Sequence, residues 1–212
     1  MYKATIQVPE EWNGMEIPPP ITLQLRPTFE MTPDQLLVFA THNDDLHFEL
    51  TADGELIVMT PGGGMTGLRN VELTIQLLTW AKQNDLGQAF SHTVGFILKG
   101  NAVRAPSASW TSRERRERRG PGDRDVFPAL CPDFVVELRW PNHNLGIVRA
   151  KMDEYLENDL RLGWLIDPVN RRVSVYRPET AVQILDAPET ISADPLLPGF
   201  VLDLRPIWQP EL

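Results

Sequence analysis

Cysteine is almost absent from this chain of 212 residues, in which Cys131 is the only one. A lone cysteine excludes an internal disulfide and argues against a zinc site built on cysteine thiolates. Long apolar runs are also missing, since no stretch approaches the ~20 residues of a membrane-spanning helix. Residues 1–11 lack the apolar core of a secretory signal. The sequence therefore predicts a cytoplasmic protein without a membrane segment.

Positive charge is scarce as well, with 20 Lys and Arg against 29 Asp and Glu and a net charge of -9. Because phosphate binding needs a cationic surface, this balance argues against broad affinity for nucleic acid, although it leaves room for a small basic patch. The run Arg113–Arg119 is the densest group of basic residues. It has two interpretations: a solvated, partly helical surface loop, or a loop that faces phosphate groups.

The chain is long enough for one large domain, and its 42% hydrophobic content suffices for a sizeable core. Residues 1–30 combine short β-like pieces (2–8 and 21–25) with proline-rich joints, which indicates an N-terminal arm laid either on the domain of residues 31–212 or on a partner subunit. A helix capped by Thr32 should follow the arm. Ala52-Asp53-Gly54 between two apolar runs then predicts a β-hairpin of residues 46–51 and 55–60.

The rest of the chain alternates helices with short strands. We expect a long helix at 65–85 with Leu68, Val71, Ile75 and Leu78 in the core, and a second helix at 145–158. Strands are expected at 88–91, 94–98, 102–110, 134–138, 163–167, 172–176, 182–185 and 200–204. This order predicts an α/β fold with a mixed central sheet flanked by helices and extra β-hairpins. The segments 134–138, 145–158 and 163–167 should form a right-handed parallel βαβ unit.

Three charged residues stand in segments expected to be buried. Glu137 lies inside the apolar strand 134–138, where an ionised carboxylate needs a compensating partner. Glu49 lies in the first strand of the hairpin, and Lys151 borders the apolar face of the second helix. Two carboxylates and a lysine suggest a hydrolytic site for a hard divalent cation such as Mg²⁺ or Mn²⁺. The alternatives are a solvent-facing Glu49, a structural ion pair of Glu137 with Arg139 or Lys151, and a solvated Lys151.

Four stretches within about residues 32–208 have a distinctive combination of motifs. They begin at Glu49 (Glu-Leu-Thr-Ala-Asp-Gly-Glu-Leu-Ile-Val-Met), Cys131 (Cys-Pro-Asp-Phe-Val-Val-Glu-Leu-Arg), Lys151 (Lys-Met-Asp-Glu-Tyr-Leu) and Gly163 (Gly-Trp-Leu-Ile-Asp-Pro). In this order they resemble the Uma-type family, described as putative restriction endonucleases, in the PD-(D/E)XK nuclease superfamily.

The resemblance implies a restriction-endonuclease-like fold and a Mg²⁺-dependent phosphodiesterase site that cuts DNA. In that pattern Glu49 is the early acidic residue, Glu137 is the central metal ligand, and the carbonyl of Leu138 lies near the metal. Arg139 stands where the superfamily lysine is often found, and Lys151 matches the helix lysine that replaces it in this family. The resemblance also favours a homodimer, in which the second subunit would cover the arm and the late strands.

The chain departs from the family pattern in two places. Ser107 occupies the position of the aspartate that is the principal metal ligand, and a neutral hydroxyl binds Mg²⁺ far less well than a carboxylate. The stretch after the central strand contains His143, a candidate ligand or base that could also be merely solvated. Asp133 is too far along its strand from Glu137, about 13 Å, to replace the missing carboxylate.

Two hypotheses follow from these observations. In the first, the protein is a Mg²⁺-dependent endonuclease that Ser107 has weakened or inactivated, with weak or absent binding of the metal. In the second, it is a catalytically degenerate relative that keeps the fold as a binding or assembly module. A non-nuclease metal hydrolase has no specific support in the sequence.

Overall fold

The computed structural model describes residues 19–59, 62–119, 126–141 and 143–211. The strand expected at 2–8, and with it most of the N-terminal arm, lies outside these residues. Within them, no helix is both long enough and apolar enough to cross a lipid bilayer.

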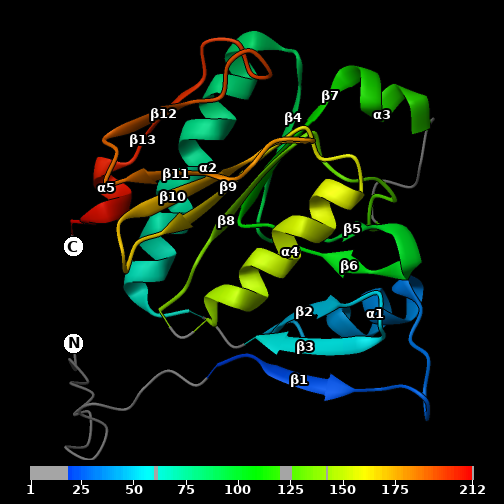
Figure 1. The fold of residues 1–212 in the computed structure, drawn as a ribbon. Coiled ribbons are helices and arrows are strands. Elements are labelled where there is room, and N and C mark those ends of the chain that lie inside the picture. Colours follow the sequence, from blue (N-terminus) through cyan, green and yellow to red (C-terminus); the bar gives the residue numbers. More distant parts are fainter. Residues whose placement is uncertain (1–18, 60–61, 120–125, 142, 212) are drawn as a thin grey trace, which may run out of the picture.

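A six-stranded sheet forms the centre of the molecule (Figure 1). Its strands in spatial order are β11 (Gln183–Asp186), β10 (Arg172–Tyr176), β9 (Leu162–Asp167), β8 (Phe134–Leu138), β7 (Ala108–Ser112) and β4 (Gly87–Ser91). β8 and β9 are parallel and are joined through helix α4 (Leu145–Glu157), which confirms the expected βαβ unit. The other neighbours in the sheet are antiparallel. The predicted mixed α/β fold is therefore correct.

Helices cover both faces of this sheet (Figure 1). Alternate residues of a strand point to opposite faces, so each strand contributes side chains to both layers of the core. Phe134, Val136 and Leu138 of β8 pack in the same core cluster as helix α2 (Gly64–Asn84). Val135 packs on the other side, with α4. Glu137 has the same parity as Val135, so its side chain also points towards α4.

A smaller five-stranded sheet lies beside the lower part of α4 (Figure 1). Its order is β1 (Ile21–Gln24), β3 (Glu55–Met59), β2 (His47–Leu50), β6 (Val103–Arg104) and β5 (Phe96–Ile97). Helix α1 (Pro33–Thr41) begins at a Thr32–Gln35 capping box and contributes Leu36 to the core of this sheet. β2 and β3 form the expected hairpin, whose turn places Gly54 at φ 82°. The position of β2 brings Glu49 close to α4.

The core stripe predicted for the first long helix is only partly correct, since Leu78 packs against the core but Val71 and Ile75 do not belong to it. Val71 and Ile75 are 63% and 54% exposed, and the buried face of α2 is built from other residues. They are Thr66, Asn70, Leu73, Leu77, Trp80 and Ala81. Two of these are polar, so the apolar spacing alone pointed to the wrong side of the helix. Trp80 fixes the true face by packing on Trp110 and donating a hydrogen bond to the carbonyl of Pro198.

Several shorter elements also differ from the expectations. The single strand expected at 102–110 is two strands, β6 and β7, which belong to different sheets. The basic run forms helix α3 (Arg113–Arg119). Near the C-terminus, strand β12 (Thr190–Ser192) and helix α5 (Arg205–Trp208) were not anticipated, and β12 pairs with β13 (Val201–Asp203). Elements of three or four residues are too short to produce a recognisable periodicity.

Candidate active site

Four residues singled out in the sequence line one cavity of about 620 Å³. Glu49 comes from β2, Ser107 from the turn before β7, Glu137 from β8 and Lys151 from α4. The two carboxylates and the serine are buried, and the side chain of Lys151 is 13% exposed. The alternatives of a solvent-facing Glu49 and a solvated Lys151 are therefore wrong. The cavity lies where the small sheet meets α4 and the end of β8.

Lys151 is the centre of the cluster. Its Nζ lies 2.5 Å from Oε1 of Glu49 and 2.8 Å from Oε1 of Glu137, and it donates a hydrogen bond to the carbonyl of Ala105 at 3.2 Å. Burial alone would lower the pKa of the Lys151 ammonium, but the adjacent Glu137 and Glu49 carboxylates raise that pKa above its ordinary value. Lys151 is thus a fixed positive charge shared by two carboxylates.

The Glu49 carboxylate is held on both oxygens. Oε1 accepts from the backbone N–H of Ala105 at 3.0 Å, and Oε2 accepts from Nη1 of Arg104 at 3.2 Å. Arg104 also donates through Nε to Oε2 of Glu154 at 2.5 Å. Burial pushes the pKa of Glu49 upward, but Lys151 and Arg104 together bring it below its usual value. The ionised form of Glu49 is therefore more favoured than that of an ordinary glutamate.

The negative charge of Glu137 is compensated by fewer groups than that of Glu49. Its Oε1 accepts a hydrogen bond from the Tyr155 hydroxyl at 3.0 Å in addition to the contact with Lys151. Burial raises the pKa of Glu137, Lys151 opposes that rise, and the negative charge of Glu49 adds to it, so that the pKa lies above its ordinary value. Two neighbouring carboxylates with pKa values moved in opposite directions are typical of functional sites.

The cluster as a whole carries more negative than positive charge. Three carboxylates, of Glu49, Glu137 and Glu154, face the two cations Lys151 and Arg104. The imbalance extends to the cavity wall, which has seven acidic and two basic side chains. A phosphate group that enters this cavity therefore meets a repulsive field unless a cation accompanies it.

Comparison with known proteins identifies the family. The family model "Uma2: Putative restriction endonuclease" matches residues 33–205. The chain belongs to the Uma2 family. A crystal structure of a putative nuclease belonging to DUF820 from Anabaena variabilis superposes with a TM-score of 0.67 at 19% identity, covering 84% of this chain and 97% of that one. A comparison with curated proteins gave no match. The family and the nuclease-like fold expected from the sequence are both confirmed.

Ser107, the residue expected at the position of the metal-binding aspartate, has a hydroxyl that is already engaged in a hydrogen bond. Oγ of Ser107 accepts a hydrogen bond from the backbone N–H of Leu138 at 2.9 Å. Among the described residues, no three His, Cys, Asp or Glu side chains are grouped to hold a metal ion. Mg²⁺ and Mn²⁺ prefer several oxygen ligands of negative charge. This site offers Glu137 beside a neutral hydroxyl and an ammonium, and both oxygens of Glu49 are already bound by protein groups. The donor set does not fit either ion.

The two further candidates, Arg139 and His143, have different surroundings. Arg139 pairs with Asp167 at 2.9 Å and donates to the carbonyl of His143 at 3.2 Å, so it is not the partner of Glu137. His143 lines the cavity, and its half-buried ring stacks on Trp140 with centroids 5.1 Å apart. Burial and the charge of Lys151 lower the pKa of His143 to about 4, which keeps the imidazole neutral at physiological pH.

The basic helix α3 does not reach the cavity wall. Arg113 pairs with Asp85, Arg115 with Asp133, and Arg118 with Glu114. These pairs support the interpretation of the run as a surface segment.

Sequence reasoning missed Arg104, Tyr155 and Glu154 as members of the cluster. Tyr155 was recognised only as part of the apolar stripe of its helix. Arg104 could have been found, because an arginine inside a segment predicted to be a strand requires a buried partner.

Proposed function

We propose that this Uma2 protein is a DNA endonuclease whose hydrolysis of phosphodiester bonds is weakened by Ser107. The observation that carries the proposal is the meeting of Glu49, Ser107, Glu137 and Lys151 in one cavity. These are the positions that the family pattern assigns to the reaction, and the match over residues 33–205 supports using that pattern. Action on DNA also suits the cytoplasmic location expected from the sequence.

The weakness follows from the charges of the site. In the superfamily pattern a Mg²⁺ or Mn²⁺ ion offsets the charge of the phosphate, and here the residues present do not fit such an ion. Lys151 is the cation nearest to Glu137, but its charge is already shared by two carboxylates. To face a phosphate, the ammonium must give up part of these contacts, which raises the barrier to reaction.

Restoring the missing carboxylate is the direct test. Calorimetric titration should show weak or no binding of Mg²⁺ and Mn²⁺ to the wild type, and at least a tenfold tighter site in Ser107→Asp. The same variant should raise cleavage of single- or double-stranded DNA more than any other single substitution. Ser107→Asn is the matched control, because it has the size of aspartate without the charge, and it should gain neither property.

Two results would contradict the proposal. A micromolar Mg²⁺ site in the wild type would show that Ser107 does not weaken metal binding. Equal inertness of the wild type and Ser107→Asp on both forms of DNA would show that the reaction has been assigned to the wrong site.

A second candidate is a binding or assembly module that has lost catalysis. The observation in its favour is that Lys151, Arg104, Glu49 and Glu137 satisfy one another in ion pairs without a metal. Binding assays in the presence of a chelator distinguish the two functions. A module should bind its target fully without divalent ions, whereas the endonuclease should bind or cut DNA better as Mn²⁺ is added.

We also propose that the protein forms a homodimer. The exposed apolar side chains of Ile21 and Leu23 support this proposal, because they lie on one face of β1, an edge strand of the smaller sheet. Light scattering during gel filtration should give twice the mass of the chain, and Leu23→Glu should lower it to that of the monomer. A wild type that elutes as a monomer at all concentrations would refute it.

A further inference from the structure

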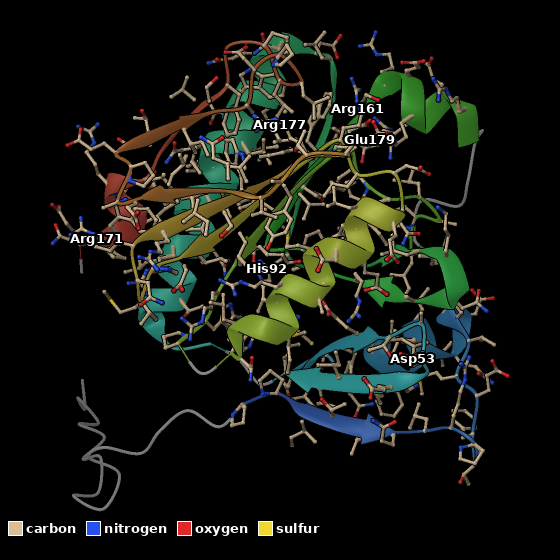
Figure 2. The ribbon with its side chains drawn as sticks, viewed as in Figure 1. Asp53, His92, Arg161, Arg171, Arg177 and Glu179 are labelled. Carbon is tan, nitrogen blue, oxygen red and sulfur yellow. The ribbon has the colours of Figure 1, made fainter. Side chains whose placement is uncertain are left out.

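A second cavity of about 420 Å³ adjoins the candidate active site. His47, Asn70, His92 and Trp140 line both cavities, so the two spaces share a wall. Figure 2 labels His92 in the middle of the molecule, in the region between the central strands and the smaller sheet. The volume falls within the roughly 300–1,000 Å³ of small-molecule sites.

The two cavities differ in charge. The wall of the active-site cavity carries seven acidic and two basic side chains, whereas the wall of the second contains no Asp, Glu, Lys or Arg among the described residues. Its surface combines the aliphatic side chains of Val71 and Ile75 with the polar heteroatoms of Asn70 and the histidines. An uncharged wall of this kind suits a neutral, largely apolar group with a polar edge, and it gives a phosphate no partner.

Two buried heteroatoms at the junction have no hydrogen-bond partner in the described part of the chain. They are Oδ1 of Asn70 and Nδ1 of His92. Asn70 is only 7% exposed, and leaving a buried amide oxygen unpaired costs about 1–3 kcal/mol. His92 stands edge-on to His47, with ring centroids 5.4 Å apart. Both free atoms belong to residues that line the cavity, so a bound group with a polar edge could satisfy them.

Aromatic rings border the same space. Trp140 lines both cavities, and its ring stacks on His143 with an interplanar angle of 19°. Nucleobases of single-stranded nucleic acids pack on aromatic side chains such as tryptophan. A planar heterocycle with hydrogen-bonding atoms at its edge therefore suits the volume, polarity and charge of the second cavity.

We propose that the second cavity is a nucleobase subsite, which takes the unpaired base of a nucleotide whose phosphodiester group lies beside Glu137 and Lys151. Asn70 accepts a hydrogen bond from an N–H group on the base edge, His92 supplies the second polar contact, and Trp140 borders the ring. The inference rests on the proposed function, because it assigns the substrate as single-stranded or locally unpaired nucleic acid.

The test compares a short fluorescein-labelled single-stranded oligonucleotide with the same oligonucleotide lacking its bases, by anisotropy in the presence of a chelator. The wild type should bind the base-bearing form about tenfold more tightly, as expected for one stacked base. Asn70→Leu and Trp140→Leu should weaken binding of the base-bearing form more than binding of the abasic form, and so remove most of this preference. Asn84→Leu is the matched control, since Asn84 lies on the same helix outside the cavity and should keep the preference.

Fluorescence of the wild type gives an independent measure that needs no variant to fold. Quenching of tryptophan emission by the base-bearing form, and not by the abasic form, supports the subsite. Equal affinity of the wild type for both forms overturns it, leaves the proposed function standing and assigns the free atoms of Asn70 and His92 to water. Failure of the wild type to bind or cut any nucleic acid, with Ser107→Asp equally inert, overturns both proposals.

Discussion

The two ends of strand β8 carry buried carboxylates that are treated very differently by their surroundings. At the start of the strand, Asp133 accepts from the backbone N–H of Ser112 at 2.7 Å and pairs with Arg115 at 3.0 Å and Arg161 at 3.5 Å. Near its end, Glu137 shares the single cation Lys151 with Glu49.

We interpret Asp133 as a structural carboxylate and propose that Glu137 is a functional one. Asp133 has two guanidinium groups to itself, and it does not line either cavity. Glu137 shares the Lys151 ammonium with Glu49 and lines the larger cavity. Its pKa is raised because burial and Glu49 oppose its ionisation. A buried charge that its neighbours leave under-compensated, at the edge of a cavity, is available to interact with something else.

The largest effect should come from removing the shared cation. Lys151→Met leaves Glu49 and Glu137 buried side by side, and breaking such a pair costs about 3–5 kcal/mol. The free energy of unfolding in urea at neutral pH measures the loss. Adding Glu137→Gln to this variant should recover part of it, because one of the two uncompensated charges is then gone. A loss below about 1 kcal/mol would mean that solvent screens the cluster.

The corresponding change at the other end of the strand should have a smaller effect. Asp133→Asn keeps an acceptor for Ser112 but leaves Arg115 without its carboxylate, which should cost about 2–3 kcal/mol. In a variant that combines Ser107→Asp with Asp133→Asn, the molecules that remain folded should keep the DNA cleavage gained by Ser107→Asp. If Asp133→Asn abolished that activity without loss of structure, the distinction between the two ends of the strand would fail.

His143 should make stability depend on pH over a limited window. Burial lowers its pKa from 6.5 in the unfolded chain to about 4 in the folded protein, so the unfolded state binds the proton first as pH falls. The stability contributed by the neutral ring is complete above 6.5 and is lost progressively towards 4. For a half-buried ring we expect about 1 kcal/mol after allowance for solvent screening. Nuclear magnetic resonance titration of the wild type, and unfolding of His143→Gln as a function of pH, measure this contribution.

The smallest effect on stability should come from Glu137→Gln. Because the folded state already favours the proton on this carboxyl group, the neutral amide should leave the free energy of unfolding unchanged or raise it by up to about 1 kcal/mol. The same substitution should abolish the DNA cleavage gained by Ser107→Asp. A loss of more than about 2 kcal/mol would place Glu137 with Asp133 among the structural carboxylates.

Much of the fold could be predicted because it depends on local signals. Strand 134–138 is an apolar run interrupted only by Glu137, and the spacing of Val148, Met152 and Tyr155 identified the buried face of α4. The prediction failed for α2, whose buried face contains Thr66 and Asn70. That face is decided by contacts with β7 and the C-terminal segment, which lie far away in the sequence.

The sequence by itself determined the family and the order of the main elements, because both are encoded in short motifs and local patterns. It also led us to predict that Ser107 stands in place of an aspartate. Only the tertiary structure decided which charges meet. It placed Lys151 between Glu49 and Glu137, Arg104 between Glu49 and Glu154, and Arg139 on Asp167. Ion pairing depends on distances of a few ångströms between side chains up to a hundred residues apart, and no local pattern specifies these.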